Sequence, residues 1–196
     1  MLRAARDFTA ESGANNVIFE YADAEQLPFG DSMFDLVTCR VTAHHFRRGA
    51  QFVKESGRVL KTGGMLVVED HVLPEDKDLA GYVERFEKMR DPSHNRAFSA
   101  NEWRQMYQDN GLGVCQVELV LKRHIFYEWA ERQSPSRQVL EDLEEMVDRA
   151  PERVLAWIQP ECFGSEQASF TNYHILISGH KKAYEKQYSN RYDKRT

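Results

Sequence analysis

The chain has 196 residues, of which 41% are hydrophobic and 29% charged, a composition that fits one ordinary globular domain with its own core. Its net charge of −5 argues against nucleic acid or an anionic membrane surface as a partner. No apolar run approaches the roughly 20 residues of a membrane span. Three cysteines without CxxC spacing and an N-terminus without a signal-peptide core favour a cytoplasmic setting.

The first half of the chain alternates predicted helices and strands. Helices are predicted over 2–12 and 50–60, and strands over 16–21, 34–39 and 65–70. Gly13 is expected to end the first helix in the left-handed conformation. The strand over 34–39 is mostly apolar, which predicts burial on both faces. Strand, helix and strand in this rhythm predict a parallel sheet with right-handed crossovers.

The second half has a different pattern. Helices are predicted over 79–89 and 100–110, the latter opened by a capping box of Ser99 and Glu102, and over 137–157 with a break at Pro151. Strands are predicted over 114–126 and 169–178, and they suit an antiparallel closing pair at the sheet edge. We expect one domain over 1–180 with a helical insert at about 133–160. The charged tail over 181–196 is expected to be flexible.

Five segments in order carry a family resemblance: ADAEQLPF (22–29), FDLVTCR (34–40), AHHF (43–46), ESGRVLKTGG (55–64) and RDPSH (90–94). Together they resemble the S-adenosylmethionine-dependent methyltransferases of the Rossmann-like class, type 11, near those of ubiquinone and menaquinone biosynthesis. The resemblance implies an α/β fold, a mostly parallel sheet with an antiparallel closing pair, and methyl transfer from S-adenosylmethionine to a small-molecule acceptor.

The family opens with a strand and a Gly-rich turn that contacts the cofactor, and Met1 falls downstream of that turn. The resemblance therefore implies an N-terminally truncated fold that lacks part of its cofactor site. We expect such a chain to form a homodimer through exposed strand edges or to fold marginally. A non-catalytic remnant acting as a binding or dimerisation module is the alternative to a working methyltransferase.

The resemblance assigns the cofactor to Asp23, Ala24, Leu27, Cys39 and Arg40. Adenine presents an amino donor beside a ring-nitrogen acceptor, so a carboxylate followed by a free N–H can meet both, as Asp23 and Ala24 would. Leu27 would supply apolar surface for the ring. Cys39 and Arg40 close a strand, where open α/β sheets bind such ligands. The plainer interpretation is that Asp23 only caps a turn.

Two histidines, His44 and His45, follow the strand over 34–39 at the place where the family binds the methyl group and the acceptor. An imidazole can take the proton of an acceptor O–H or N–H because its pKa lies near working pH. We name both as catalytic candidates. The alternative is that a histidine here caps the next helix or packs beneath the site.

The resemblance places Arg90, His94 and Trp103 in the part of the fold that meets the acceptor. Arg90 and His94 would hold an anionic or phenolic group. Alternatively, Arg90 and Asp91 form a pair that fixes a turn, and Trp103 packs in the core.

A metal site built from His44, His45 and His71 is a distant third possibility. No pair of these histidines has the i, i+4 helical spacing of a hydrolytic zinc motif, so we expect no metal.

Overall fold

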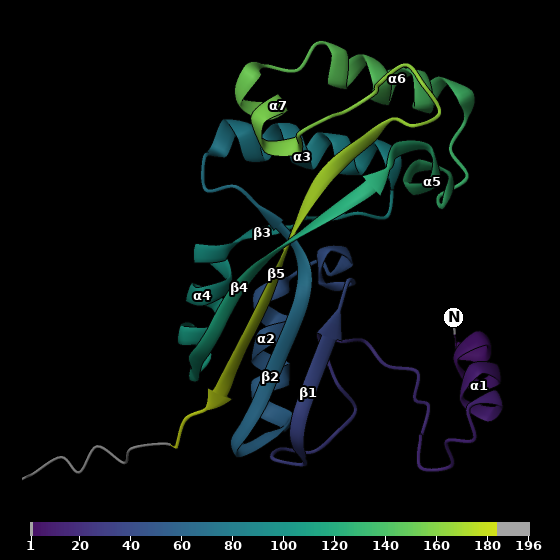
Figure 1. The fold of residues 1–196 in the computed structure, drawn as a ribbon. Coiled ribbons are helices and arrows are strands. Elements are labelled where there is room, and N and C mark those ends of the chain that lie inside the picture. Colours follow the sequence, from purple (N-terminus) through teal and green to yellow (C-terminus); the bar gives the residue numbers. More distant parts are fainter. Residues whose placement is uncertain (1, 184–196) are drawn as a thin grey trace, which may run out of the picture.

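The computed structural model describes residues 2–183 (Figure 1). Its strands are β1 (Phe34–Arg40), β2 (Leu60–Leu73), β3 (Phe98–Ser99), β4 (Leu112–Ile125) and β5 (Ser169–Lys181). The sheet order is β1-β2-β5-β4, with β3 beside β2. β1 and β2 are parallel, and β5 is antiparallel to both β2 and β4. The predicted Rossmann-like α/β fold with an antiparallel closing pair is confirmed.

Two hydrophobic clusters divide the molecule. The first lies between the sheet and helices α2 (Gly49–Val59) and α4 (Ala100–Asp109), around Leu66, Trp103 and Tyr107. The second lies among four helices that we call the helical cap: α3 (Lys77–Arg90), α5 (Phe126–Glu131), α6 (Arg137–Asp148) and α7 (Glu152–Ile158). Figure 1 shows the helical cap gathered at one end of the sheet, where β4 and β5 extend beyond β1. The sheet and the cap therefore pack around separate cores.

Local sequence signals explain where several helices begin. The Ser99 side chain accepts from the Glu102 N–H and the Glu102 side chain accepts from the Ser99 N–H, which confirms the capping box that opens α4. Pro151 stands at the N-cap of α7, because proline can begin a helix but cannot continue one. Gly13 has a φ of 71° just after α1 (Leu2–Glu11), as predicted for a left-handed helix end.

The sequence predictions were wrong in three places. Residues 16–21 form no strand, because the described chain places no strand beside them to complete a hydrogen-bonded ladder. β1 is mostly exposed rather than buried on both faces, since it lies at the edge of the sheet and Leu36 keeps 54% of its surface accessible. The third error is a missed helix: α5 precedes the insert expected at about 133–160, which does contain α6 and α7, and it buries Phe126 and Trp129 in the helical cap.

None of the helices within residues 2–183 is long and apolar enough to cross a bilayer. Most of the predicted flexible tail, residues 184–196, lies outside the described residues.

Candidate functional site

The carboxyl ends of β1 and β2 meet at the edge of the sheet that faces the helical cap. Arg40 at the end of β1 pairs in register with Glu69 of β2, and its Nε lies 3.0 Å from a Glu69 carboxylate oxygen. Val41 follows with a φ of 47°, a left-handed conformation that is unusual for a β-branched residue. Such backbone strain concentrates at functional sites. The chain then forms a short 3₁₀ turn, η1 (Ala43–His45), which places two histidines at this edge.

His44 is held by Asp70 of β2. The His44 Nδ1 atom lies 2.5 Å from Asp70 Oδ1, and the His44 backbone N–H donates to Asp70 Oδ2 at 3.0 Å. Both side chains are buried. Burial alone would raise the pKa of Asp70, but the hydrogen bond and charge of His44 and the His71 N–H bring that pKa below its usual range. Because an ionised carboxylate only accepts, His44 carries its proton on Nδ1 and leaves Nε2 free.

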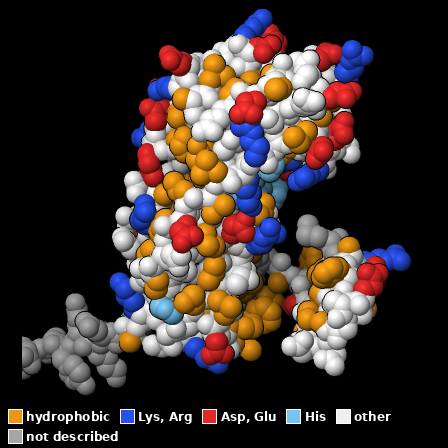
Figure 2. All heavy atoms as spheres, viewed as in Figure 1, with side chains coloured by type: hydrophobic (Ala, Val, Ile, Leu, Met, Phe, Trp, Pro, Cys, Tyr) orange, Lys and Arg blue, Asp and Glu red, His pale blue; other side chains and the backbone are white. Residues whose placement is uncertain are grey.

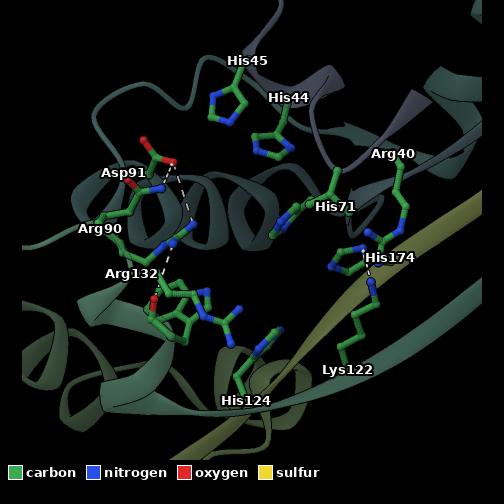
Figure 3. Close-up of a pocket in the computed structure, with 13 residues that line it drawn as sticks. Arg40, His44, His45, His71, Arg90, Asp91, Lys122, His124, Arg132 and His174 are labelled. Carbon is green, nitrogen blue, oxygen red and sulfur yellow. Dashed lines mark hydrogen bonds and ion pairs between the residues drawn. The ribbon is translucent and has the colours of Figure 1, made fainter. Parts of the chain in front are cut away.

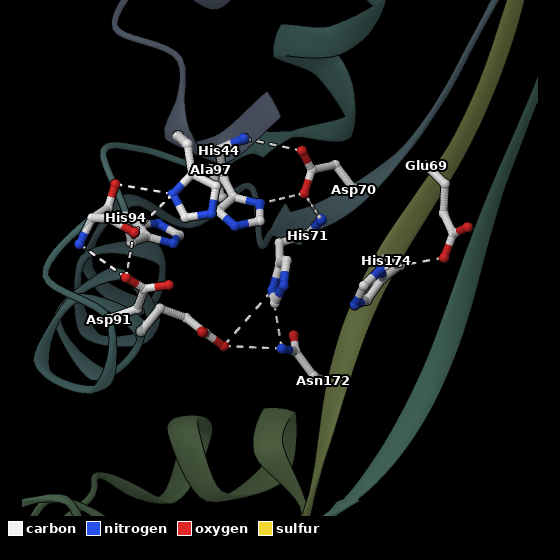
Figure 4. A network of polar contacts seen from close by, with 12 residues as sticks. His44, Glu69, Asp70, His71, Asp91, His94, Ala97, Asn172 and His174 are labelled. Carbon is white, nitrogen blue, oxygen red and sulfur yellow. Dashed lines mark hydrogen bonds and ion pairs between the residues drawn. The ribbon is translucent and has the colours of Figure 1, made fainter. Parts of the chain in front are cut away.

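Two more histidines, His71 and His174, line the site from β2 and β5 and are paired in the β2–β5 register. Asn172 donates from its amide to His71 Nδ1 at 3.0 Å and to a Glu87 carboxylate oxygen at 2.9 Å (Figure 4). Burial lowers the pKa of His71 to about 3 and that of His174 to about 3. Both imidazoles are therefore neutral at physiological pH.

His45 lies beside a turn that follows α3. Its Nδ1 donates to the Ser93 carbonyl oxygen at 3.0 Å, and its side chain is half-buried. The Asp91 carboxylate accepts from the Ser93 N–H at 2.9 Å and from the Ser93 hydroxyl at 2.6 Å, so Asp91 fixes the turn. The Arg90 guanidinium is 4.0 Å from Asp91, too far for a hydrogen bond.

A cavity of about 420 Å³ lies where the helical cap meets the sheet. Figure 3 shows His44 and His45 on one side, with Arg90, Arg132 and His124 across from them. In Figure 2, histidine, lysine and arginine side chains gather at the indentation between the cap and the sheet. The lining residues are Arg40, Val41, His44, His45, His71, Arg90, Asp91, Lys122, His124, Trp129, Arg132, Gln133 and His174. The cavity is thus rich in imidazole and cationic groups.

The residues predicted to meet adenine lie apart from this cavity, in the loop before β1. Asp23 is exposed, and its side chain accepts from the Glu25 N–H at 2.8 Å, as a turn cap does. The Ala24 N–H has no hydrogen-bond partner among residues 2–183. The Leu27 N–H donates to the buried Glu55 carboxylate at 3.0 Å, which ties the loop to α2. Cys39 is buried, and burial raises the pKa of its thiol to about 12.

Only one of the three residues predicted to meet the acceptor lines the cavity. Arg90 lines the cavity, but His94 and Trp103 do not. His94 is buried, its ring stacks on that of His44 with the centroids 5.0 Å apart, and its Nε2 atom lies 2.9 Å from a Glu84 carboxylate oxygen. Trp103 is 1% exposed and packs edge-on against Phe98 in the first cluster. Its placement favours the core-packing interpretation for Trp103, and His94 is buried behind His44.

Sequence reasoning named no role for Lys122, His124, Arg132 and His174, which all line the cavity. Three of them come from the β4–β5 pair, and Arg132 follows α5. A polar residue in the middle of an apolar strand, such as His174 within YHILI, is the one signal that was available.

The ligand atoms of His44, Asp70 and His71 lie within 4.8 Å of one another, as a metal site would require. Both Asp70 oxygens, however, already accept from N–H donors of the two histidines. This donor set fits a hydrogen-bonded imidazole–carboxylate pair better than metal ligation.

Comparison with known proteins assigns the class. Residues 1–68 match a family model described as a methyltransferase domain. The chain is 33% identical over 186 residues to the uncharacterized methyltransferase YcgJ of Bacillus subtilis (strain 168), covering 93% of this chain and 72% of YcgJ. It therefore belongs to the methyltransferase family. The crystal structure of YcgJ superposes with a TM-score of 0.88 and is covered to 79%.

More distant matches agree with this class. The ubiquinone/menaquinone biosynthesis C-methyltransferase UbiE of Azotobacter vinelandii is 40% identical over 75 residues, which cover 38% of this chain and 30% of UbiE. The structure of geranyl diphosphate methyltransferase in complex with SAM has a TM-score of 0.55 at 13% identity, covers 92% of this chain and 64% of its own, and shows the fold alone. None of these matches favours a non-catalytic binding module.

Proposed function

We propose that this chain transfers a methyl group from S-adenosylmethionine to a small-molecule acceptor that binds in the cavity under the helical cap. The observation that carries the proposal is the buried His44–Asp70 pair at the carboxyl ends of two parallel strands, where it opens on a cavity of about 420 Å³. Open α/β sheets bind their ligands at this edge. The family and the fold neighbour solved with SAM support the same cofactor.

The loop before β1 suits the nucleoside part of the cofactor. The exposed Asp23 carboxylate and the unpartnered Ala24 N–H offer an acceptor and a donor side by side, which complement the edge of adenine. Leu27 would contact the ring, and Cys39 and Arg40 would lie between this loop and the cavity. The cofactor supplies an electrophilic methyl group on a positively charged sulfur.

His44 suits the role of a base toward the acceptor. Its Nδ1–H is engaged by Asp70, so the Nε2 lone pair can take the proton of an acceptor O–H or N–H. The Asp70 carboxylate holds this tautomer and would stabilise the imidazolium that forms. His45 is the second candidate, since its Nδ1–H donates to the Ser93 carbonyl and likewise leaves Nε2 free. Arg90 would orient the acceptor, and orientation supplies much of the acceleration in such reactions.

Titration with S-adenosylhomocysteine in a calorimeter tests the cofactor assignment. We expect micromolar binding, about 8 kcal/mol, which Asp23→Ala weakens and Asp31→Ala leaves unchanged. Asp31 is a matched control because it is an exposed aspartate of the same loop whose carboxylate pairs with Arg58. If the folded chain does not bind S-adenosylhomocysteine, the proposal is wrong for this chain.

A further inference from the structure

Three side chains with N–H groups converge on the cap side of the cavity. Arg90 ends α3, His124 lies near the end of β4, and Arg132 follows α5. Figure 3 shows the three close together, across the cavity from His44 and His45. They come from segments far apart in the sequence, and the packing of the helical cap brings them to one wall.

Arg90 is a buried cation with an unsatisfied donor. Only 10% of its side chain is exposed, and its Nε–H has no hydrogen-bond partner in the described chain. The guanidinium carbon lies 4.5 Å from the centroid of the Trp129 ring, which holds the group in place from one side. The nearest carboxylates, Glu87 at 3.8 Å and Asp91 at 4.0 Å, are beyond hydrogen-bond distance. Buried hydrogen-bond donors rarely remain unpaired, so we expect the Arg90 Nε–H to donate to a bound ligand.

Arg90 Nη1 donates to the Trp129 carbonyl oxygen at 3.5 Å, so Nε is its unpaired buried donor within the described chain. His124 also has an unpaired buried ring nitrogen, Nε2, among residues 2–183, and Arg132 is exposed to solvent. Over the same residues, the Arg132 side chain appears in no hydrogen bond or ion pair, although Arg132 lies close enough to His124 to lower its pKa together with burial.

The other cations of the cavity are already paired. Arg40 and Lys122 share the Glu69 carboxylate. Among the cations that line the cavity, Arg132 is therefore the one with no carboxylate within ion-pair distance in residues 2–183, and Arg90, although near Glu87 and Asp91, keeps an unpaired Nε–H.

We propose that Arg90, Arg132 and His124 form an anion site that holds a carboxylate or phosphate group of the methyl acceptor. The inference rests on the proposed function and names the chemical class of its substrate: a small molecule with an anionic oxygen group at one end and the methyl-accepting atom at the other. Guanidinium groups bind both anions through paired N–H donors. With the anion held at this wall, the rest of the acceptor extends across the cavity toward His44.

The test is an NMR titration that follows the Arg side-chain Nε–H and the His124 ring signals. The probes are inorganic phosphate and benzoate, each added at constant ionic strength. We expect at least one probe to shift the Arg90 and His124 signals with saturation. Arg132→Gln should weaken that binding about tenfold, the loss of one charge-assisted hydrogen bond. Saturation by phosphate alone would identify a phosphate ester, and saturation by benzoate alone a carboxylate.

Arg137→Gln is the matched control, because Arg137 is exposed on α6, outside the cavity, and its replacement changes the net charge equally. The proposal is overturned if neither probe shifts Arg90 and His124, or if Arg132→Gln and Arg137→Gln weaken binding equally. Calorimetry with S-adenosylhomocysteine separates the two proposals. Arg132→Gln should bind it like the wild type, and anion binding without cofactor binding would refute the proposed function while leaving the anion site in place.

Discussion

His44 and Asp70 are 26 residues apart in the chain, yet His44 Nδ1 lies 2.5 Å from Asp70 Oδ1. The parallel pairing of β1 and β2 produces this contact, because it brings the end of one strand beside the other and the 3₁₀ turn then folds His44 over it. The contact fixes both the ring orientation and the tautomer of the imidazole. Those two properties separate a base that is ready to act from a histidine that only packs.

Replacing Asp70 by asparagine should change the tautomer of the His44 imidazole. An asparagine amide can donate to His44 Nδ1 and so move the imidazole proton to Nε2, where it blocks proton uptake. Once an acceptor has been identified with labelled S-adenosylmethionine, we expect kcat to fall about 100-fold or more, with S-adenosylhomocysteine affinity unchanged. Asp31→Asn, the same change at an exposed site, should keep full activity. A fully active Asp70→Asn would remove His44 from the mechanism.

Stability should decrease on mild acidification. The folded-state pKa values of His71 and His174, both about 3, lie below the unfolded value near 6.5. Below pH 6.5 the unfolded chain thus binds more protons than the folded one, and the free energy of unfolding falls as pH drops toward 3. Urea unfolding at a series of pH values measures this slope. Imidazole signals of His71 and His174 that titrate near pH 6.5 in the folded protein would contradict it.

Asp70 should make a second contribution to the free energy of unfolding that is lost at acidic pH. Its folded-state pKa is lowered, so the stability it confers is complete above the unfolded value of about 3.9 and is lost as pH falls through the folded value. The difference in free energy of unfolding between wild type and Asp70→Asn should be constant from pH 5 to 7 and should narrow below about pH 4. A difference that stays constant down to pH 2 would show that Asp70 is not preferentially ionised in the folded state.

Gly179 of β5 has no room for a side chain. A methyl group there would meet the Tyr107 ring at 2.8 Å and the Gly113 carbonyl oxygen at 2.9 Å. Gly179→Ala should therefore lower the free energy of unfolding by about 1–3 kcal/mol. At Gly30 the nearest atom is the Met33 sulfur at 3.5 Å, so Gly30→Ala should stay within about 0.5 kcal/mol of wild type. Equal urea midpoints for the two variants would contradict the tight packing of α4 on β5.

The cysteines should differ in reactivity. Cys115 and Cys162 are exposed, whereas Cys39 is buried with its thiol pKa raised to about 12. Because the thiolate is the reactive form, a thiol reagent such as DTNB should modify two cysteines rapidly and the third only after unfolding. Rapid modification of Cys39 in the native protein would show that the β1 edge opens readily.

Local patterns in the sequence were enough to predict most elements. The capping box of Ser99 and Glu102 located α4 because both partners lie within one helical turn. The prediction of a strand over 16–21 was wrong because a strand requires a neighbouring strand to pair with. The alternation of apolar residues within a segment does not show whether such a neighbour exists. β1 was predicted correctly as a strand but not in its exposure, which depends on its place at the sheet edge.

The site was predictable only in part, for the same reason. Arg40 ends β1, and His44 and His45 follow it within five residues, so the strand-end rule was sufficient to place them at the cavity. Arg132 and His124 reach the cavity only because the helical cap folds back over the sheet, an arrangement set by packing around residues such as Trp129 and Phe170. No spacing pattern in the sequence indicates that the cap packs back over the sheet in this way.

The division into two cores has a consequence for how such a protein can change over time. His44 is held by the core of the sheet, whereas Arg90 and Arg132 lie at the ends of α3 and α5, which pack in the core of the cap. Substitutions inside the cap can move or replace the two arginines of the proposed anion site while leaving the imidazole–carboxylate pair in position. Under the proposed function, the group that acts on the acceptor and the groups that select it would rest on separate cores, so that a lineage could exchange one substrate for another without rebuilding the reaction.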